Sequence, residues 1–185
     1  MIQPQHVASL LQTFETASDG ETEKSRELIL ALLAHSPAPF SRDSYTPGHV
    51  TCTGAVLAPG GNAVLLVHHR RLDRWLLPGG HVELEDATIG DVARREVVEE
   101  TGAALAGTAP LLVGVDVHPI PPNKREPLHL HHDLIFAFQA CSEQFQVSEE
   151  SRAVAWCPLD QFNRYDLPGS IRRSILRAIS NVSAD

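Results

Sequence analysis

The sequence predicts an α/β protein in which a helical extension precedes a domain of interleaved strands and helices. Two observations support this prediction. From residue 49 onwards, runs rich in β-branched residues alternate with turn residues and with helical patterns. The first 47 residues show helical apolar spacing and end in a proline-rich segment. We therefore expect a helical hairpin and linker over residues 1–47 and the main domain over residues 48–185.

The composition is that of a globular protein, with 43% hydrophobic and 21% charged residues among 185. No apolar run approaches the length of about 18 residues that predicts a membrane span, and the N-terminus lacks the pattern of a secretory signal. Three cysteines without a CxxC motif indicate free thiols in a reducing compartment, so we expect a cytoplasmic protein. The net charge of −8 disfavours non-specific nucleic-acid binding.

Two helices are expected in the extension. Apolar residues spaced i, i+3, i+4 and i+7 predict the first over residues 4–16. Ser18-Asp19-Gly20 breaks it and can cap a second helix over residues 21–34. We expect this hairpin to pack on the main domain; the alternative is a dimerisation or lid element. The assembly is therefore expected to be a monomer or a homodimer.

The main domain is expected to contain both strands and helices in alternation. Strands are predicted over residues 49–58, 63–69, 111–118, 129–140 and 153–158, and helices over residues 88–101 and 167–180.

Three carboxylates lie on one side of the helix predicted at residues 88–101. Glu96 and Glu100 are four residues apart and Glu99 is three from Glu96, so they share a face. They crowd the last turn before Gly102, where the helix dipole already presents partial negative charge. A solvated acidic face is one interpretation. The other is a site for Mg²⁺ or Mn²⁺, whose binding would turn the repulsion into coordination.

The segment that starts at Gly79 resembles the Nudix box, the signature of hydrolases that act on nucleoside diphosphates linked to another group. That box reads glycine, five residues, glutamate, seven residues and then REUxEExGU, where U is apolar. The nine residues from Arg95 to Ala103 match its second half. Gly80 matches its first glycine, and Glu83 falls at the glutamate of the frequent GGxxE pattern.

The resemblance covers roughly residues 48–165 and implies a Nudix-type α/β/α sandwich with a mixed β-sheet, plus the N-terminal helical extension. One feature departs from the box. The residue six after Gly80 is Asp86 rather than glutamate, and eight residues rather than seven separate it from Arg95. The turn before the helix therefore carries one extra residue, and Asp86 or Thr88 is expected to cap the helix.

The resemblance implies that Glu96 and Glu100 bind a divalent metal ion, Mg²⁺ or Mn²⁺, and that Glu99 binds metal or orients water. The carbonyl of Gly79 would complete the metal shell, and Arg95 would orient the carboxylates. The implied reaction is metal-assisted attack of water on one phosphorus atom of a diphosphate. The expected partner is a small nucleoside diphosphate derivative, for example ADP-ribose, a nucleotide sugar or a nucleoside triphosphate.

Further residues are candidates for the same site. Glu99, Glu149 and Glu150 are candidates for the general base, the last two from the loop before the final strand. Residues expected to contact the substrate are Arg74, His81, Glu83, His129 and His131. Basic residues that would meet phosphates, with solvated surface charge as the alternative, are Arg70, Arg71, Arg74, Lys124 and Arg125.

The histidines gather in the middle of the chain. His129, His131 and Asp133 alternate along a predicted strand and therefore emerge on one face, whereas His132 faces the other way. They are expected to surround the phosphate site or to form a second metal site. The alternative is a strand whose polar positions face solvent.

Two other functions stay open. A non-catalytic sensor of a nucleotide derivative would use the same fold, although such proteins often lose the box glutamates that this chain keeps. A prenyl-diphosphate isomerase would need a catalytic cysteine in the pocket. Cys52 is the one cysteine near the first strand, and its TCTG setting does not match the isomerase motif.

Overall fold

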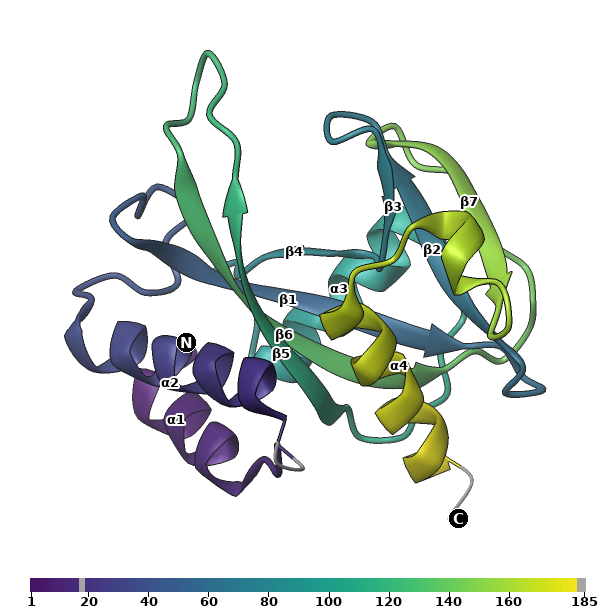
Figure 1. The fold of residues 1–185 in the computed structure, drawn as a ribbon, viewed down its shortest axis with the longest axis horizontal. Coiled ribbons are helices and arrows are strands. Elements are labelled where there is room, and N and C mark those ends of the chain that lie inside the picture. The colour runs from purple at the N-terminus through teal and green to yellow at the C-terminus, as the bar shows by residue number, and fades with distance from the viewer. Residues whose placement is uncertain (17–18, 183–185) are drawn as a thin grey trace.

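The structure is a computed structural model that describes residues 1–16 and 19–182. Its elements follow one another in the order α1 (Pro4–Thr13), α2 (Gly20–His35), β1 (Gly48–Leu57), β2 (Ala63–His69), β3 (Arg74–Leu76), β4 (Gly79–His81), α3 (Ile89–Thr101), β5 (Leu111–Ile120), β6 (His129–Gln139), β7 (Ser151–Pro158), the 3₁₀ helix η1 (Phe162–Tyr165) and α4 (Gly169–Val182). Figure 1 shows their arrangement.

A mixed sheet of seven strands forms the centre of the molecule. Its main path has the order β3-β2-β1-β6-β5, with β4 paired to β1 and β7 paired to β2. β1 and β6 run parallel along the full length of β1, whereas the other pairs are antiparallel. The predicted α/β/α sandwich with a mixed sheet is therefore confirmed.

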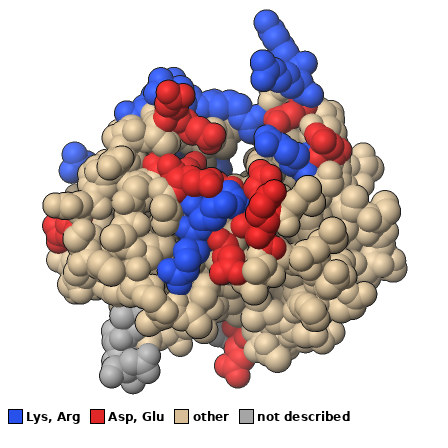
Figure 2. Space-filling view, turned by 180° about the vertical axis from the view of Figure 1, so that it is seen from behind, with Lys and Arg blue, Asp and Glu red and all other residues tan. Residues whose placement is uncertain are grey.

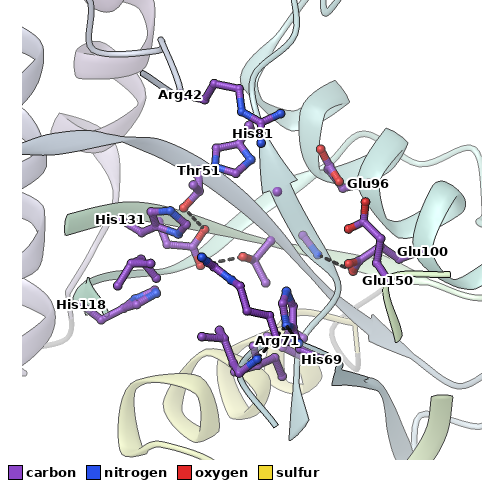
Figure 3. A pocket seen from close by; sticks show the side chains of 18 of the residues that line it. Arg42, Thr51, His69, Arg71, His81, Glu96, Glu100, His118, His131 and Glu150 are labelled. Carbon is purple, nitrogen blue, oxygen red and sulfur yellow. Dashed lines mark hydrogen bonds between the residues drawn. The ribbon is translucent and has the colours of Figure 1, made fainter. Parts of the chain in front are cut away.

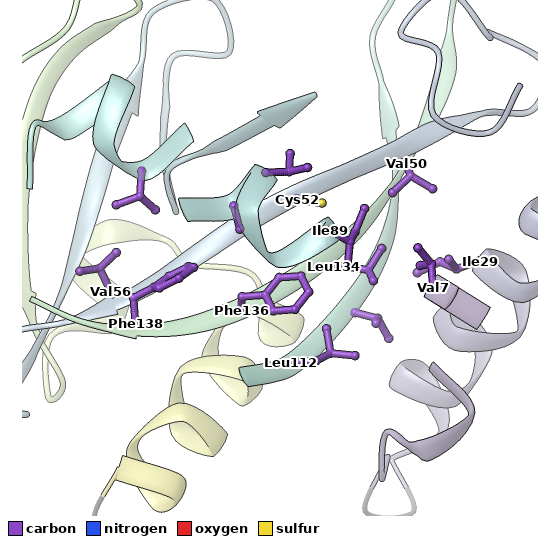
Figure 4. Close-up of a cluster of buried hydrophobic side chains, with 14 of the residues drawn as sticks. Val7, Ile29, Val50, Cys52, Val56, Ile89, Leu112, Leu134, Phe136 and Phe138 are labelled. Carbon is purple, nitrogen blue, oxygen red and sulfur yellow. The ribbon is translucent and has the colours of Figure 1, made fainter. Parts of the chain in front are cut away.

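The two faces of the sheet are covered by different helices. Because side chains alternate along a strand, even-numbered residues of β1 and β6 enter one core and odd-numbered residues enter the other. Val50, Cys52 and Phe136 pack with α3, α1 and α2 on the first face, which Figure 4 shows. Ala55 and Ile135 pack with α4 on the second face.

The N-terminal helices contribute to the first core, as expected for a packed hairpin. Val7 and Leu11 of α1 and Ile29 and Leu32 of α2 are buried with the sheet residues. The side chain of Asp19 caps α2 by accepting a hydrogen bond from the Glu21 amide. Ser18, the other residue expected in this break, lies outside the described residues. Among the described helices, none combines the length and hydropathy that a bilayer span requires.

The observed elements differ from the expected ones at a few places. α1 ends at Thr13 rather than residue 16, because Phe14 already has an extended backbone with ψ of 119°. β5 continues through Pro119, which an edge strand tolerates because the missing amide has no partner to lose. The sequence analysis predicts neither β3 nor β4, since three residues are too few to show a period of two.

Replacing Ile29 with alanine tests whether the hairpin belongs to the core. Ile29 is fully buried, so Ile29→Ala should lower the free energy of unfolding by about 2–5 kcal/mol. Leu28, its neighbour on the same helix, is 50% exposed and provides the control. Leu28→Ala should change the free energy by no more than about 0.5 kcal/mol. Urea unfolding measures both, and equal small effects would show that α2 does not share the core.

Candidate active site

A cavity of about 1190 Å³ opens over the odd-numbered face of β1 and β6. Its walls come from all the strands except β7, from α3 and the start of α4, and from the linker before β1, the β2–β3 turn and the loops after β5 and before β7. Figure 2 shows this hollow with acidic and basic side chains around it. In Figure 3, the carboxylates Glu96, Glu100 and Glu150 lie on one side of the cavity, and His81, His131 and His118 lie on the other.

Helix α3 is held in place at both ends. Thr88, one of the two expected caps, accepts a hydrogen bond from the Asp91 amide, and the Asp91 side chain accepts one from the Thr88 amide. Gly102 ends the helix in the left-handed conformation with φ of 61°, as the sequence predicts. These caps fix the direction in which the glutamates of the last two turns project.

Glu100 is the most buried carboxylate of the cavity wall that α3 provides. Only 6% of the residue is exposed, and its Oε2 accepts a hydrogen bond of 3.0 Å from the Gly79 amide. Burial raises the pKa of Glu100 to about 8, the Gly79 hydrogen bond opposes the shift, and the charges of Glu96 and Glu150 add to it. Burial also raises the pKa of Glu96, against the lowering effect of Arg95.

Arg95 ties the acidic residues of the box together. Its Nε and Nη2 donate to Asp86 at 3.1 and 3.0 Å, and its Nη1 donates to Glu96 at 2.8 Å and to Glu99 at 3.0 Å. Nη2 also donates to the His81 carbonyl at 2.8 Å. Asp86, the residue that departs from the box, is therefore a bidentate partner of Arg95. Its side chain does not line the cavity.

Gly80 leaves room for the Glu96 carboxylate where β4 passes it. A Cβ on this residue would lie 2.6 Å from the Glu96 carboxylate carbon, closer than van der Waals contact allows. The absence of a side chain therefore lets the strand and the carboxylate approach one another. This contact gives a physical reason for the glycine at the first position of the box pattern.

The two candidate bases from the loop before β7 are placed differently. Glu150 lines the cavity, whereas Glu149 does not. Within the described part of the chain, the Glu150 carboxylate has no hydrogen-bond or ion-pair partner. The backbone carbonyl of Glu149 accepts a hydrogen bond of 3.0 Å from Arg70 Nε, which fixes this loop. The geometry thus separates two residues that the sequence analysis treats alike.

Basic residues surround the mouth of the same cavity. Those that line it are Arg42, Arg70, Arg71, Arg74, Arg95, Lys124 and Arg125. Arg71 pairs with Glu126 at 2.8 Å and thereby connects the β2–β3 turn to the loop after β5. All of these are expected from the sequence except Arg42, which comes from the proline-rich linker and has no motif to identify it.

Two of the three histidines of β6 are buried, and the third, His131, is half-buried. His129 and His132 are 4% and 2% exposed, and His131 lines the cavity with His81 and His118. Burial lowers the pKa of His81 to about 4 and that of His131 to about 2, and neighbouring imidazoles contribute, so both rings are neutral at pH 7.

Asp133 anchors the floor of the cavity. Its carboxylate accepts hydrogen bonds of 3.0 Å from Thr51 Oγ1 and 2.6 Å from Thr53 Oγ1. Burial raises its pKa to about 6, opposed by the charge of His118 and by both threonine hydroxyls. No sequence pattern singles out the two threonines, because only the pairing of β1 with β6 places them beside Asp133.

The remaining expected residues lie at the rim or behind the wall. Glu83 lines the cavity as an exposed residue, and Arg74 lines it from β3. The Gly79 amide donates a hydrogen bond to Glu100. His129 lies behind His131 and does not line the cavity. Cys52 is completely buried in the apolar core, on the face of β1 opposite Thr51 and Thr53.

Comparison with solved structures finds the same fold in known hydrolases. A hydrolase of the NUDIX family from Clostridium perfringens has 19% sequence identity and a TM-score of 0.51, and the match covers 74% of this chain and 97% of that one. A MutT NUDIX hydrolase from Burkholderia pseudomallei has 26% identity and a TM-score of 0.51, covering 72% and 96%. An Ap4A hydrolase from C. elegans has 14% identity and a TM-score of 0.51, covering 74% and 98%.

Comparison with curated proteins gave no match. The family model that describes the NUDIX domain matches residues 48–178, which include every strand of the sheet and all of the box. The N-terminal helices α1 and α2 precede the matched segment. With the match extending over most of its length, this chain belongs to the NUDIX domain family.

Proposed function

We propose that the protein hydrolyses a diphosphate linkage in a nucleoside diphosphate joined to another group, with a divalent metal ion bound by carboxylates of α3. The observation that carries this proposal is the meeting of Glu96, Glu100 and Glu150 at one cavity wall. The pKa values of Glu96 and Glu100 are raised, chiefly by burial, and carboxylate charges contribute to both shifts. A cation that neutralised this charge would be bound strongly.

The donors present fit Mg²⁺ or Mn²⁺. Both ions prefer carboxylate and carbonyl oxygens, and Glu96, Glu99 and Glu100 supply such oxygens from neighbouring turns of one helix. Glu96 and Glu100 would hold the ion, with Glu99 at the exposed side. When bound, the ion lowers the pKa of a water molecule and neutralises charge that develops on phosphate oxygens. The Gly79 carbonyl stays a predicted ligand.

Arg95 and Asp86 position the carboxylates. The guanidinium holds one oxygen of Glu96 and one of Glu99, and Asp86 fixes the guanidinium on its other side. The lone pairs that remain on both glutamates are thereby oriented before the substrate arrives. Arg95 thus acts through the carboxylates and is a positioning residue.

Glu150 is the candidate that best fits the general base. It lines the cavity on the side of Glu96 and Glu100, and its charge raises the pKa of both. Glu99 is less suited, because its carboxylate is already paired with Arg95 at 3.0 Å and is 58% exposed. A water molecule between Glu150 and the diphosphate would pass its proton to this carboxylate.

The basic rim suits the phosphates of the substrate. Arg70 is fixed by the carbonyls of Glu149 and Ser151, and Arg71 by Glu126. Within the described residues, the side chains of Arg74, Lys124 and Arg125 have no ion-pair partner. They are therefore available to an anionic ligand, as proposed for a nucleoside diphosphate derivative.

The buried position of Cys52 argues against isomerase chemistry. Burial raises the pKa of its thiol well above the ordinary value, and its place in the apolar core keeps it from a ligand in the cavity. A sensor remains distinguishable by experiment, because it would bind nucleotide derivatives without turnover.

Glutamine at either metal-binding position tests the proposal directly. Glu96→Gln and Glu100→Gln each remove one charge and one ligand at nearly constant shape. Turnover with Mg²⁺ or Mn²⁺ should fall at least about 100-fold, which corresponds to roughly 3 kcal/mol of transition-state stabilisation. Glu85→Gln, which changes an exposed carboxylate outside the cavity, is the control. Chromatography of products from a panel of nucleotide derivatives measures turnover, and normal turnover in Glu100→Gln would refute the assignment.

The two neighbouring glutamates before β7 form a matched pair for the base. Glu150→Gln should lower the turnover number about 100-fold or more, because general base catalysis contributes about 10²–10⁴-fold. Glu149→Gln should leave it within about twofold, since Glu149 lies outside the cavity. Steady-state kinetics from pH 6 to 9 checks both variants. A larger loss of turnover in Glu149→Gln than in Glu150→Gln would show that Glu150 is not the general base.

The raised pKa of Glu100 predicts how the metal-free protein responds to pH. Its pKa in the folded protein, about 8, lies above the ordinary value of 4.5. The stability that the neutral carboxyl provides is therefore complete below about pH 4.5 and is lost as the pH rises through 8. Urea unfolding in the presence of a chelator measures this. The free energy of unfolding of Glu100→Gln should increase relative to that of the parent protein as the pH rises from 5.5 to 8.5. A difference that is constant over this range would contradict the raised pKa.

A further inference from the structure

A second group of metal-ligating side chains lies across the cavity from the α3 carboxylates. His49 comes from β1, and His129 and His131 come from β6. In the parallel pairing of these strands, His49 stands beside His131. His129 is two residues before His131 and therefore points to the same face. The register of β1 and β6 thus brings three imidazoles together.

The three rings form a close cluster. The ring centroid of His49 lies 5.1 Å from that of His129 and 5.0 Å from that of His131, and the latter two are 5.3 Å apart. One nitrogen from each ring lies within 4.8 Å of the others. His49 and His129 are 1% and 4% exposed, so solvent does not separate the rings.

Hydrogen bonds to the backbone fix the tautomers of two rings. Nδ1 of His49 lies 3.1 Å from the Ser44 carbonyl, and Nδ1 of His129 lies 2.8 Å from the Pro127 carbonyl. A carbonyl only accepts, so each Nδ1 carries the proton and, in the neutral ring, Nε2 carries a lone pair. This is the arrangement in which metal-ligating histidines are commonly held.

Among the described residues, the lone pair of His49 has no partner. Its Nε2 is buried without a hydrogen bond to any described residue. Buried polar atoms in folded proteins are almost always paired, and an exception calls for an explanation such as an ion. A metal at the centre of the cluster would provide the missing partner.

We propose that His49, His129 and His131 bind one transition-metal ion, with Zn²⁺ as the first candidate, at a site separate from the α3 carboxylates. Imidazole nitrogens favour Zn²⁺, Ni²⁺, Cu²⁺ and Fe²⁺, whereas Mg²⁺ prefers oxygen. Three protein ligands leave a fourth position of a tetrahedral ion open. His131 lines the cavity, so the proposed site borders the space where a substrate would bind.

The site is independent of the proposed hydrolysis, and its test does not use turnover. Glu96→Gln/Glu100→Gln first removes the competing oxygen site. Isothermal titration with Zn²⁺ should then still show one equivalent bound. In that background, His129→Gln/His131→Gln should weaken Zn²⁺ affinity by at least about 100-fold, beyond the roughly 10–100-fold that loss of an outer-shell partner costs.

His132→Gln is the matched control, because His132 is equally buried on the same strand but faces the other side of the sheet. It should bind Zn²⁺ as the background protein does. Melting temperatures in chelator establish that each variant is folded. Equal Zn²⁺ affinity in the folded His129→Gln/His131→Gln variant would overturn the proposal.

A measurement without histidine variants covers the case in which they fail to fold. Co²⁺ added to the Glu96→Gln/Glu100→Gln protein should give the intense visible absorption of a four-coordinate, nitrogen-bound ion, and Zn²⁺ should abolish it. Absence of both the absorption and Zn²⁺ binding would show that the imidazoles pack without a metal.

Discussion

The parallel pairing of β1 with β6 is the constraint on which the rest of the structure depends. It runs the full length of β1 in one register and gives the sheet its two distinct faces. Even-numbered residues of both strands fill the core beneath α3, and odd-numbered residues form the cavity floor and the second core. A slip of one residue would exchange these sets, placing Cys52 in the cavity and Thr51 in the core.

Electrostatics in the cavity follow from this arrangement. Burial leaves the carboxylates of Glu96 and Glu100 poorly solvated, and the nearby carboxylate charges raise their pKa values further. One arginine offsets part of this repulsion through its contacts with Asp86, Glu96 and Glu99. The fold therefore gathers an acidic cluster on one side of the cavity and, on the other, His81 and His131, which are neutral at pH 7. This separation underlies our proposals that the two sides bind different classes of cation.

The sequence was informative wherever the signal is local. The helix over residues 88–101, its end at Gly102 and the shared face of Glu96 and Glu100 are all local features, and the structure confirms each of them. Contacts between distant segments left no such signal. Arg42 and the threonines beside Asp133 reach the cavity only through the linker path and the strand register, which no short pattern encodes.

The extra residue before α3 is absorbed between two fixed points. On one side, Gly80 sets how near β4 comes to Glu96. On the other, Asp86 accepts two hydrogen bonds from Arg95, and Thr88 caps the start of α3. Side chains of α3 hold both ends of this turn, because Glu100 contacts Gly79 and Arg95 contacts the His81 carbonyl and Asp86. An added residue in this turn can therefore be accommodated while the carboxylates of α3 keep the positions that the helix gives them.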